Sequence, residues 1–196
     1  MEELKVLIMA KVNGKPIMAD QLNAALRHFL SEYYSGSLET ITEEEISQAR
    51  RIVLENLISK ELIYQEGLNK RIIVEDEEVD REMEKLKKDF PSEEEFFRRL
   101  EKEKMDYEEC REIITANLLI NKTIDAFLKN VPPVTEEEVL NYYEKHKNKL
   151  VTPYGTLPFE DVKDSIAEFM QKNREAEAIE EWLDELRERA DIEIFI

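Results

Sequence analysis

Residues 4–17, LKVLIMAKVNGKPI, carry the strand and turn pattern that decides how the ends of this chain are arranged. Residues 4–12 are rich in β-branched and aliphatic side chains, which favour a strand. Asn13-Gly14 follows directly, and this dipeptide is the strongest short signal for a tight turn between two strands. The sequence therefore predicts a strand over 4–12 that ends in a hairpin turn.

The other end of the chain has a second short strand pattern. Residues 191–196, DIEIFI, alternate polar and apolar side chains, which is typical of a half-buried strand. A strand this short is marginal in water unless it joins a sheet. We therefore expect the two chain ends to pair in one small sheet.

Helical patterns fill the region between the two strands. Thr42 with Glu45, Ser92 with Glu95, and Thr135 with Glu138 fit the capping box, and Asp106 with Glu109 is its aspartate version. Gly67 is expected to end the helix that begins near residue 43. The fold class is therefore mainly α with a small terminal sheet, and the predicted helices cover residues 18–33, 43–66, 75–89, 92–103, 106–129, 135–149 and 158–190.

The composition excludes several classes of partner. The chain has 28 basic and 46 acidic residues and a net charge of −18, so it repels phosphate backbones and anionic lipid surfaces. We expect no nucleic-acid partner. The first segment is acidic and its apolar run, VLIMA at 6–10, is short, so neither a secretion signal nor membrane insertion is predicted.

No pattern of catalytic or ligand-binding residues is found. His28 and His146 are the only histidines and Cys110 is the only cysteine, so no metal site and no internal disulfide are expected. The glycines are scattered singly, which removes the loops that cradle nucleotides and phosphates. We predict no catalytic residues, no metal and no cofactor.

Aromatic side chains are more numerous than one narrow core stripe requires. Adjacent pairs such as Phe96-Phe97 and Tyr142-Tyr143 cannot both face a single core. A helix buried on two sides, or one paired with another subunit, explains such pairs without any special function. An exposed apolar surface that accepts peptide segments is the functional interpretation.

The order of the motifs resembles the N-terminal chaperone region of the SurA and PrsA family of parvulin-type peptidyl-prolyl isomerases. The resemblance begins at VNGKPI, continues through ISQARRIVLENLISKELIYQEGLNKRIIVEDEEVDREM and VTEEEVLNYYEKHKNKL, and ends with PFEDVKDSIAEFMQKNREAEAIEEWLDELRERADIEI. It implies a helical body to which the last helix and strand return. It also implies that the protein binds unfolded or partly folded polypeptides, its clients, without ATP.

In such relatives the isomerase domain is inserted at the position of residues 151–157, a segment that we call the seam. Only a few residues separate KHKNKL from PFEDVKD here, so the isomerase domain is expected to be absent and the protein not to be an enzyme. The predicted organisation is a helical region over 1–150, a short turn at 151–157 and a returning segment over 158–196, together one composite domain.

The client-binding residues are predicted among the surplus aromatics, and core positions must be among them. The alternative function is a homo-oligomeric scaffold whose apolar surface is a dimer interface. The resemblance implies the periplasm or cell envelope if a leader precedes residue 1, whereas a native start at Met1 implies the cytoplasm. The six predicted client-binding residues are Phe29, Tyr33, Phe97, Tyr143, Phe159 and Phe169.

Overall fold

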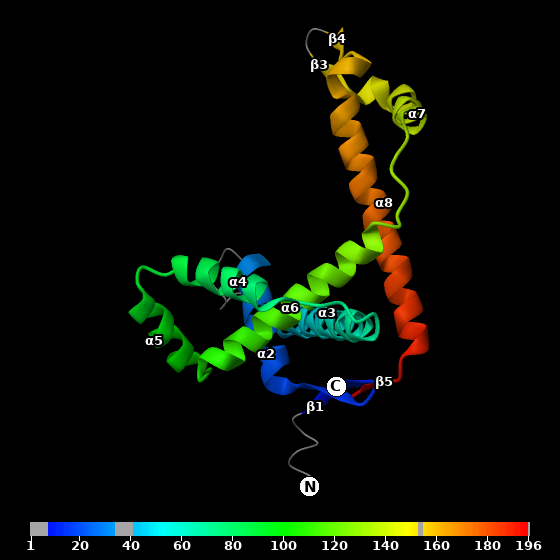
Figure 1. The fold of residues 1–196 in the computed structure, drawn as a ribbon. Helices are drawn as coiled ribbons and strands as arrows, with labels where there is room; N and C mark the ends of the chain where they lie inside the picture. The colour runs from blue at the N-terminus through cyan, green and yellow to red at the C-terminus, as the bar shows by residue number, and fades with distance from the viewer. Residues whose placement is uncertain (1–7, 34–40, 153–154, 196) are drawn as a thin grey trace. The chain divides into compact units, whose positions relative to one another are not determined.

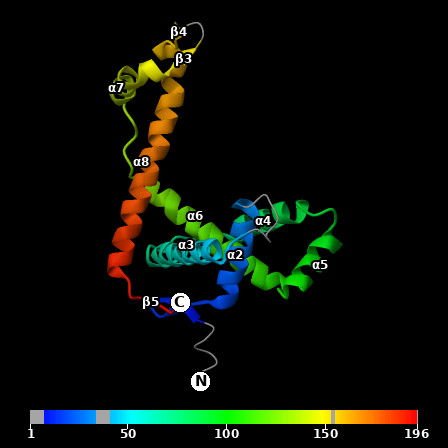
Figure 2. The same cartoon turned by 180° about the vertical axis from the view of Figure 1, so that it is seen from behind.

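The computed structural model describes residues 8–33, 41–152 and 155–195 (Figures 1 and 2). Helices make up most of these residues, and the strands at the two chain ends share one sheet. The predicted fold class, mainly α with a small terminal sheet, is therefore confirmed.

The chain forms two compact units, which we call unit 1 and unit 2. Unit 1 holds Met1–Thr123 and Glu185–Ile196, and unit 2 holds Ile124–Asp184. These boundaries differ from the predicted ones at 150 and 158. The predicted boundaries mark the seam where relatives hold a further domain, and that organisation stays a prediction.

The terminal sheet of unit 1 has the strand order β2-β1-β5, and all its pairs are antiparallel. It consists of β1 (Ile8–Val12), β2 (Lys15–Met18) and β5 (Ile192–Ile194). Val12 lies opposite Lys15 on one side and Ile192 on the other. The predicted pairing of the chain ends is confirmed for residues 8–12, while residues 4–7 lie outside the described part.

The turn between β1 and β2 is the one that the sequence predicts. Asn13 and Gly14 have φ angles of 50° and 82°, the left-handed region that a two-residue hairpin turn requires at both positions. Asparagine and glycine occupy this region more readily than other residues. The turn therefore sets the register of β1 against β2.

Two helices cover the sheet and supply the first apolar core of unit 1. α2 (Ala19–Tyr33) contacts β1, β2 and α3 (Glu43–Asn69), which also contacts β1. The buried side chains of α3 recur every three or four residues, as a helix packed along one face requires. They are Ala49, Val53, Leu54, Ile58, Leu62 and Ile63.

The prediction that Gly67 ends α3 is wrong, because the helix continues to Asn69 and Gly67 is buried inside it. A Cβ atom at Gly67 would lie 2.3 Å from the Thr123 Oγ1 atom and 3.1 Å from the Leu119 side chain. Glycine is therefore needed here for the close approach of α6 (Tyr107–Leu128). The helix α3 ends instead at Asn69, with Lys70 as its C-cap and Arg71 following at a φ of 55°.

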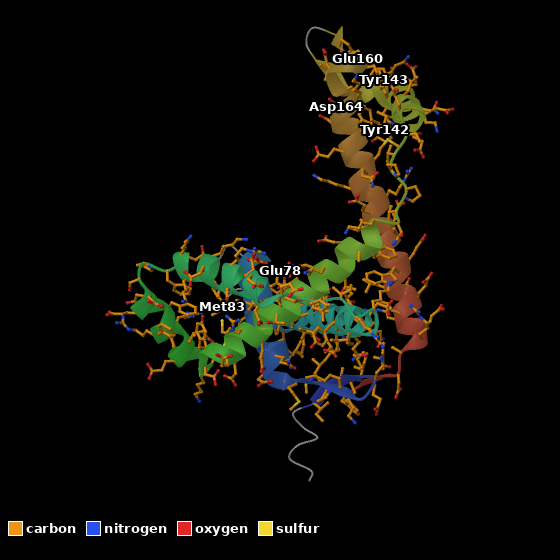
Figure 3. All side chains as sticks on the ribbon, viewed as in Figure 1. Glu78, Met83, Tyr142, Tyr143, Glu160 and Asp164 are labelled. Carbon is orange, nitrogen blue, oxygen red and sulfur yellow. The ribbon has the colours of Figure 1, made fainter. Side chains whose placement is uncertain are left out.

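A second core of unit 1 lies among three further helices. They are α4 (Asp76–Lys88), α5 (Glu93–Glu103) and α6 (Tyr107–Leu128). Their common core includes Met83, labelled in Figure 3. This core consists of the buried residues Val79, Met83, Phe96, Leu100 and Cys110.

The helix starts agree closely with the predicted ones. Complete capping boxes are present at Thr42 with Glu45 and at Thr135 with Glu138. At Ser92 the hydroxyl accepts the amide N–H of Glu95. Asp106 and Glu109 exchange both hydrogen bonds at 2.8 Å, so local sequence alone decides where these helices begin.

Unit 2 is built around α7 (Glu136–His146) and α8 (Phe159–Arg189), most of which belongs to this unit. A 3-10 helix (Lys147–Lys149) and the short antiparallel pair β3 (Val151–Thr152) and β4 (Gly155–Thr156) connect them. The core between the two helices holds Val139, Tyr143 and Ile166. None of the described helices is both long and apolar enough to cross a membrane.

Candidate functional site

Two of the six predicted client-binding residues carry large exposed rings. Phe97 on α5 is 45% exposed and Phe169 on α8 is 50% exposed. Phe97 belongs to unit 1 and Phe169 to unit 2. Each unit therefore presents one predicted aromatic side chain to solvent.

Phe97 is exposed because its neighbour Phe96 occupies the inward position of α5. The two ring centroids are 5.3 Å apart with planes at 65°, and the Phe97 ring lies 6.1 Å from that of Tyr107 on α6. Successive helical residues point about 100° apart, so only one of the pair can enter the core. We call Phe97 and Tyr107, which is partly buried, the unit 1 aromatic patch.

Phe169 has a similar position on α8. Its ring lies 6.0 Å from that of Tyr142 on α7, and Tyr142 stacks on His146 at 4.1 Å. Tyr142 and His146 are four residues apart, so they share one face of the helix. We call Phe169, Tyr142 and His146 the unit 2 aromatic patch (Tyr142 is labelled in Figure 3).

Two other predicted residues lie in the interior of unit 2. Tyr143 is buried, and its hydroxyl donates a hydrogen bond of 2.7 Å to the carbonyl oxygen of Leu157. Phe159 is partly buried with its ring 5.4 Å from that of Tyr143. On α2, Phe29 is half-buried, and the side chain of Tyr33 lies outside the described residues.

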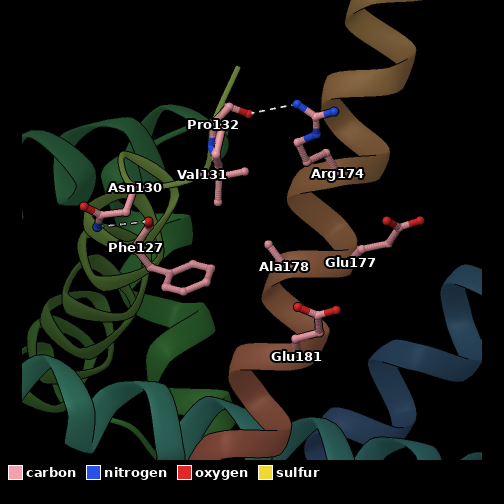
Figure 4. A pocket seen from close by; sticks show the side chains of 8 residues that line it. All are labelled: Phe127, Asn130, Val131, Pro132, Arg174, Glu177, Ala178 and Glu181. Atoms are coloured by element: carbon pink, nitrogen blue, oxygen red, sulfur yellow. Dashed lines mark hydrogen bonds between the residues drawn. The ribbon is translucent and has the colours of Figure 1, made fainter. Parts of the chain in front are cut away.

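Sequence reasoning missed a groove that lies wholly in unit 2. Its volume is about 350 Å³, within the range of small-molecule and side-chain sites. Its apolar lining residues, which we call the floor, are Phe127, Val131, Pro132 and Ala178, and its other lining residues are polar or charged. Figure 4 shows Phe127 and Val131 on one side of the groove and Ala178 and Glu181 of α8 on the other. The groove is lined by Phe127, Asn130, Val131, Pro132, Arg174, Glu177, Ala178 and Glu181.

The groove forms where the chain leaves α6 and runs beside α8. Asn130 donates from its side-chain amide to the carbonyl oxygens of Ala126 and Phe127, which covers the end of α6. Arg174 donates to the carbonyl oxygens of Pro132 and Pro133 at 3.3 and 3.1 Å. Proline has no backbone N–H to donate, so these hydrogen bonds to the two carbonyl oxygens are what fix the connecting segment against α8.

Arg174 is already paired with a carboxylate. Its guanidinium donates to Glu138 at 2.6 Å, and Glu138 also accepts hydrogen bonds from the backbone and hydroxyl of Thr135. The Thr135 backbone N–H, then Arg174 and the Thr135 hydroxyl, lower the pKa of Glu138 from 4.5 to about 2. The positive charge at the groove is therefore matched by a permanent negative one.

The remaining charges of the groove are both negative. Glu177 and Glu181 are exposed, and among the described residues neither has a hydrogen-bond or ion-pair partner. Their four-residue spacing places them on the same face of α8, where like charges repel. The groove thus combines an apolar floor with an unpaired acidic wall.

Two observations concern the groups that could hold a metal ion or act as a nucleophile. No three histidine, cysteine or acidic side chains of that part of the chain are grouped to hold a metal ion. Cys110 is buried, and this burial raises the pKa of its thiol. A buried thiol with a raised pKa is a poor nucleophile.

Comparison with known families gives a match over most of the chain. A family model described as a SurA-like N-terminal domain matches residues 2–124. The matched residues include the terminal hairpin and the helices α2 to α5. The match therefore covers the larger part of unit 1.

Curated relatives are foldase proteins named PrsA. The PrsA of a type F strain of Clostridium botulinum is 25% identical over 161 residues, which are 76% of this chain and 48% of that protein. The PrsA of Caldanaerobacter subterraneus subsp. tengcongensis is 37% identical over 95 residues, 48% of this chain and 26% of that protein. The chain spans about half the length of the first relative and about a quarter of the second.

A solved structure has the same fold along nearly the whole chain. It comes from work on the virulence factor PEB4 and the periplasmic protein Cj1289, described as two structurally related SurA-like chaperones of Campylobacter jejuni. The TM-score is 0.61 at 14% identity, with 96% of this chain and 98% of that chain covered. Unit 2, which lies outside the family match except for Ile124, is thus also part of a known fold.

Proposed function

Because this chain belongs to the family of SurA-like N-terminal domains, we propose that it is an ATP-independent chaperone of the holdase type. It would bind unfolded or partly folded polypeptides and keep them from aggregating. The observation that carries the proposal is the exposure of two aromatic rings, Phe97 and Phe169, each at the edge of an aromatic patch.

Hydrophobic capture supplies the binding free energy. An aromatic side chain buries up to about 200 Å², so covering the exposed half of one ring yields about 2.5 kcal/mol at about 25 cal/mol per Å². Ordering the client opposes this gain. Binding through two such rings is therefore broad in specificity and moderate in strength, as a holdase requires.

The acidic surface keeps the loaded protein soluble. A net charge of −18 makes copies of the chain repel one another. The same negative charge attracts clients with basic segments. Solubility and client choice would then arise from the same charges.

The proposal includes binding without prolyl isomerisation at the seam. Residues 150–158 alone separate the 3-10 helix from α8, and a parvulin domain does not fit in this length. A refolding assay limited by proline isomerisation tests this point. We expect the protein to leave the slow phase unchanged, and an acceleration would contradict the proposal.

A location in the cell envelope is a further part of the proposal. The work that gave the similar solved structure describes one of its two SurA-like chaperones, Cj1289, as periplasmic, which supports this location. Fractionation of cells that express the native gene tests it. We expect the protein in the extracytoplasmic fraction, and recovery with cytoplasmic markers would count against it.

The holdase proposal is tested by the aggregation of a chemically denatured protein on dilution. We expect the wild type to suppress light scattering at near-equal molar ratios. Phe97→Gln with Phe169→Gln should weaken this suppression several-fold, whereas Ile73→Gln, which removes a 67% exposed residue outside both patches, should not. Equal suppression by all variants, or none by the wild type, would overturn the proposal.

The dimer alternative uses the same exposed rings. If they form an interface between two copies, sedimentation of the wild type gives a dimer, and the double variant becomes a monomer without any change in client binding. If the exposed rings contact clients, the double variant sediments like the wild type but no longer suppresses client aggregation. The two measurements together separate these functions.

A further inference from the structure

We propose that the unit 2 groove binds a client segment in which a large apolar residue is adjacent to lysine or arginine. The apolar side chain would lie on the floor formed by Phe127, Val131 and Ala178, and the cation would lie against Glu177 and Glu181. The proposal rests on the proposed function, because it names the class of polypeptide that a chaperone of this kind selects.

The floor of the groove is apolar and held in place. The Phe127 ring stacks on Trp182 with centroids 4.4 Å apart and planes at 8°. Trp182 is buried, so it fixes the position of the Phe127 ring. Figure 4 shows this ring in the lining of the groove. A surface that is ordered before binding loses less entropy when a ligand arrives.

The charge at the groove selects a cation. Arg174 is occupied by Glu138 and by two carbonyl oxygens, so it offers little attraction to an acidic client. Glu177 and Glu181 repel each other, and no described residue neutralises them. A basic side chain between them would remove that repulsion and form the missing ion pair.

The end of α6 adds to this preference. The helix ends at Leu128 and its last turn carries Phe127. The carbonyl end of a helix has a partial negative charge, which favours nearby cations. Because Asn130 and Val131 already donate to the carbonyl oxygens of Ala126, Phe127 and Leu128, the helix end adds only a weak contribution of the same sign to that of the acidic wall.

The apolar floor distinguishes a polypeptide from a small cation. A metal ion or another inorganic cation makes no favourable contact with the apolar side chains of Val131, Pro132 and Ala178. Lysine and arginine carry long hydrocarbon stems that can pack on them. An apolar neighbour in the same segment would bury further surface. The occupant that fits both parts is therefore a basic and apolar stretch of chain.

Fluorescence anisotropy with two labelled peptides tests the proposal. One peptide carries Leu-Leu flanked by arginines, and the other has glutamine in place of each arginine. We expect the wild type to prefer the arginine peptide by roughly five-fold at low salt, since exposed ion pairs are individually weak. High salt should abolish the preference.

A matched pair of double variants locates the effect. Glu177→Gln with Glu181→Gln removes the acidic wall and should abolish the preference. Glu180→Gln with Asp184→Asn removes two acidic residues of α8 at the same spacing, and neither lines the groove, so it should keep the preference. Equal behaviour of the two double variants, or no preference in the wild type, would overturn the proposal.

The aggregation assay separates this proposal from the proposed function. If the wild type suppresses aggregation while the groove variants bind both peptides like the wild type, the groove proposal fails and the holdase function stands. If the wild type suppresses no aggregation, the proposed function fails whatever the peptides show.

Discussion

Gly67 lies where α3 and α6 of unit 1 pack tightly against each other. Thr123, opposite it, is fully buried and donates its hydroxyl to the carbonyl oxygen of Leu119 at 2.6 Å. A Cβ atom at Gly67 would overlap the Thr123 oxygen. Glycine is therefore needed at this position because there is no room for a Cβ atom beside Thr123, and not because the chain turns here.

Gly67→Ala should lower the free energy of unfolding although alanine favours helices. Overpacking a tight core costs about 1–3 kcal/mol, whereas the gain in helix propensity is about 1 kcal/mol. Because the approach of 2.3 Å is a severe overlap, the overpacking cost should lie near the upper end of this range, and we expect a net loss of about 2 kcal/mol in urea unfolding. In a Thr123→Ala background the same change should cost close to nothing, and an equal cost in both backgrounds would contradict the steric explanation.

Glu138 links the start of α7 to α8 within unit 2. It accepts hydrogen bonds from Thr135 and Arg174, and its pKa is lowered from 4.5 to about 2. Because the pKa of Glu138 is lower in the folded protein, its ionised carboxylate stabilises the fold. This stabilisation is fully present above pH 4.5, the ordinary pKa of glutamate, and is lost as the pH falls from 4.5 toward about 2.

Glu138→Gln should therefore change how stability depends on pH. The variant should be less stable than the wild type near pH 7, and the difference should shrink as the pH approaches about 3. Urea unfolding at both pH values measures it. Glu137→Gln serves as the control, because Glu137 lies in the same helical turn and has no partner among the described residues; a pH-independent difference for Glu138→Gln would contradict this assignment.

At the scale of elements, the hairpin of β1 and β2 is also the attachment point of β5. The Asn13 side chain accepts the amide N–H of Asp191 at 2.8 Å and donates to Gln65 on α3 at 2.7 Å. Its backbone N–H donates to the carbonyl oxygen of Asp191. One turn residue thus connects both chain ends and α3.

Asn13→Gly should cost about 1–2 kcal/mol, because glycine keeps the turn conformation but removes both side-chain hydrogen bonds. Thermal or urea unfolding measures this loss. Gly14→Ala tests the backbone alone, since its Cβ would contact nothing within 4 Å, and we expect it to cost about 1 kcal/mol from the left-handed φ. If Asn13→Gly lowers the free energy of unfolding by less than a few tenths of a kcal/mol, the Asn13 side chain does not hold β5 in place.

The helices show which of their boundaries can be predicted from neighbouring residues in the sequence. The capping residues predicted the helix starts to within a residue, since a cap depends only on side chains a few positions apart. The end of α3 was not predicted, because it depends on what Gly67 meets in α6. Start signals are local in this chain, and this helix end is decided by packing.

On the scale of the whole molecule, the two units have separate cores. Met83 is 1% exposed in the α4, α5 and α6 core, and Ile166 is 6% exposed in the α7 and α8 core. The two cores share no residue. A cavity in one should therefore weaken that unit first.

Ile166→Ala should cost about 2–4 kcal/mol and speed amide hydrogen exchange in α7 and in residues 159–170. Exchange in α4 and α5 should stay unchanged. Met83→Ala is the matched control and should give the reverse pattern. If either variant accelerates exchange equally in both regions, the units do not open separately.

Only part of the candidate site could be predicted from the sequence. Phe97 and Phe169 were predicted, and both are exposed, but their contact with clients stays a proposal. The same reasoning selected Tyr143, which is buried and hydrogen-bonded to Leu157, because helical spacing does not say which of two adjacent aromatics faces inward. The groove was missed because residues 127–132 and 174–181 meet only after α6 and α8 are placed.

The sequence by itself determined the class of fold, the turn at Asn13-Gly14, the helix starts and the pairing of the chain ends. These depend on local propensity, on capping and on the need of a short strand for a partner. Tertiary structure alone decided that Gly67 stays inside a helix, which aromatic rings remain exposed, and that Glu177 and Glu181 border an apolar floor. The physical reason is that burial and charge pairing depend on residues far apart in the chain, which only packing brings together.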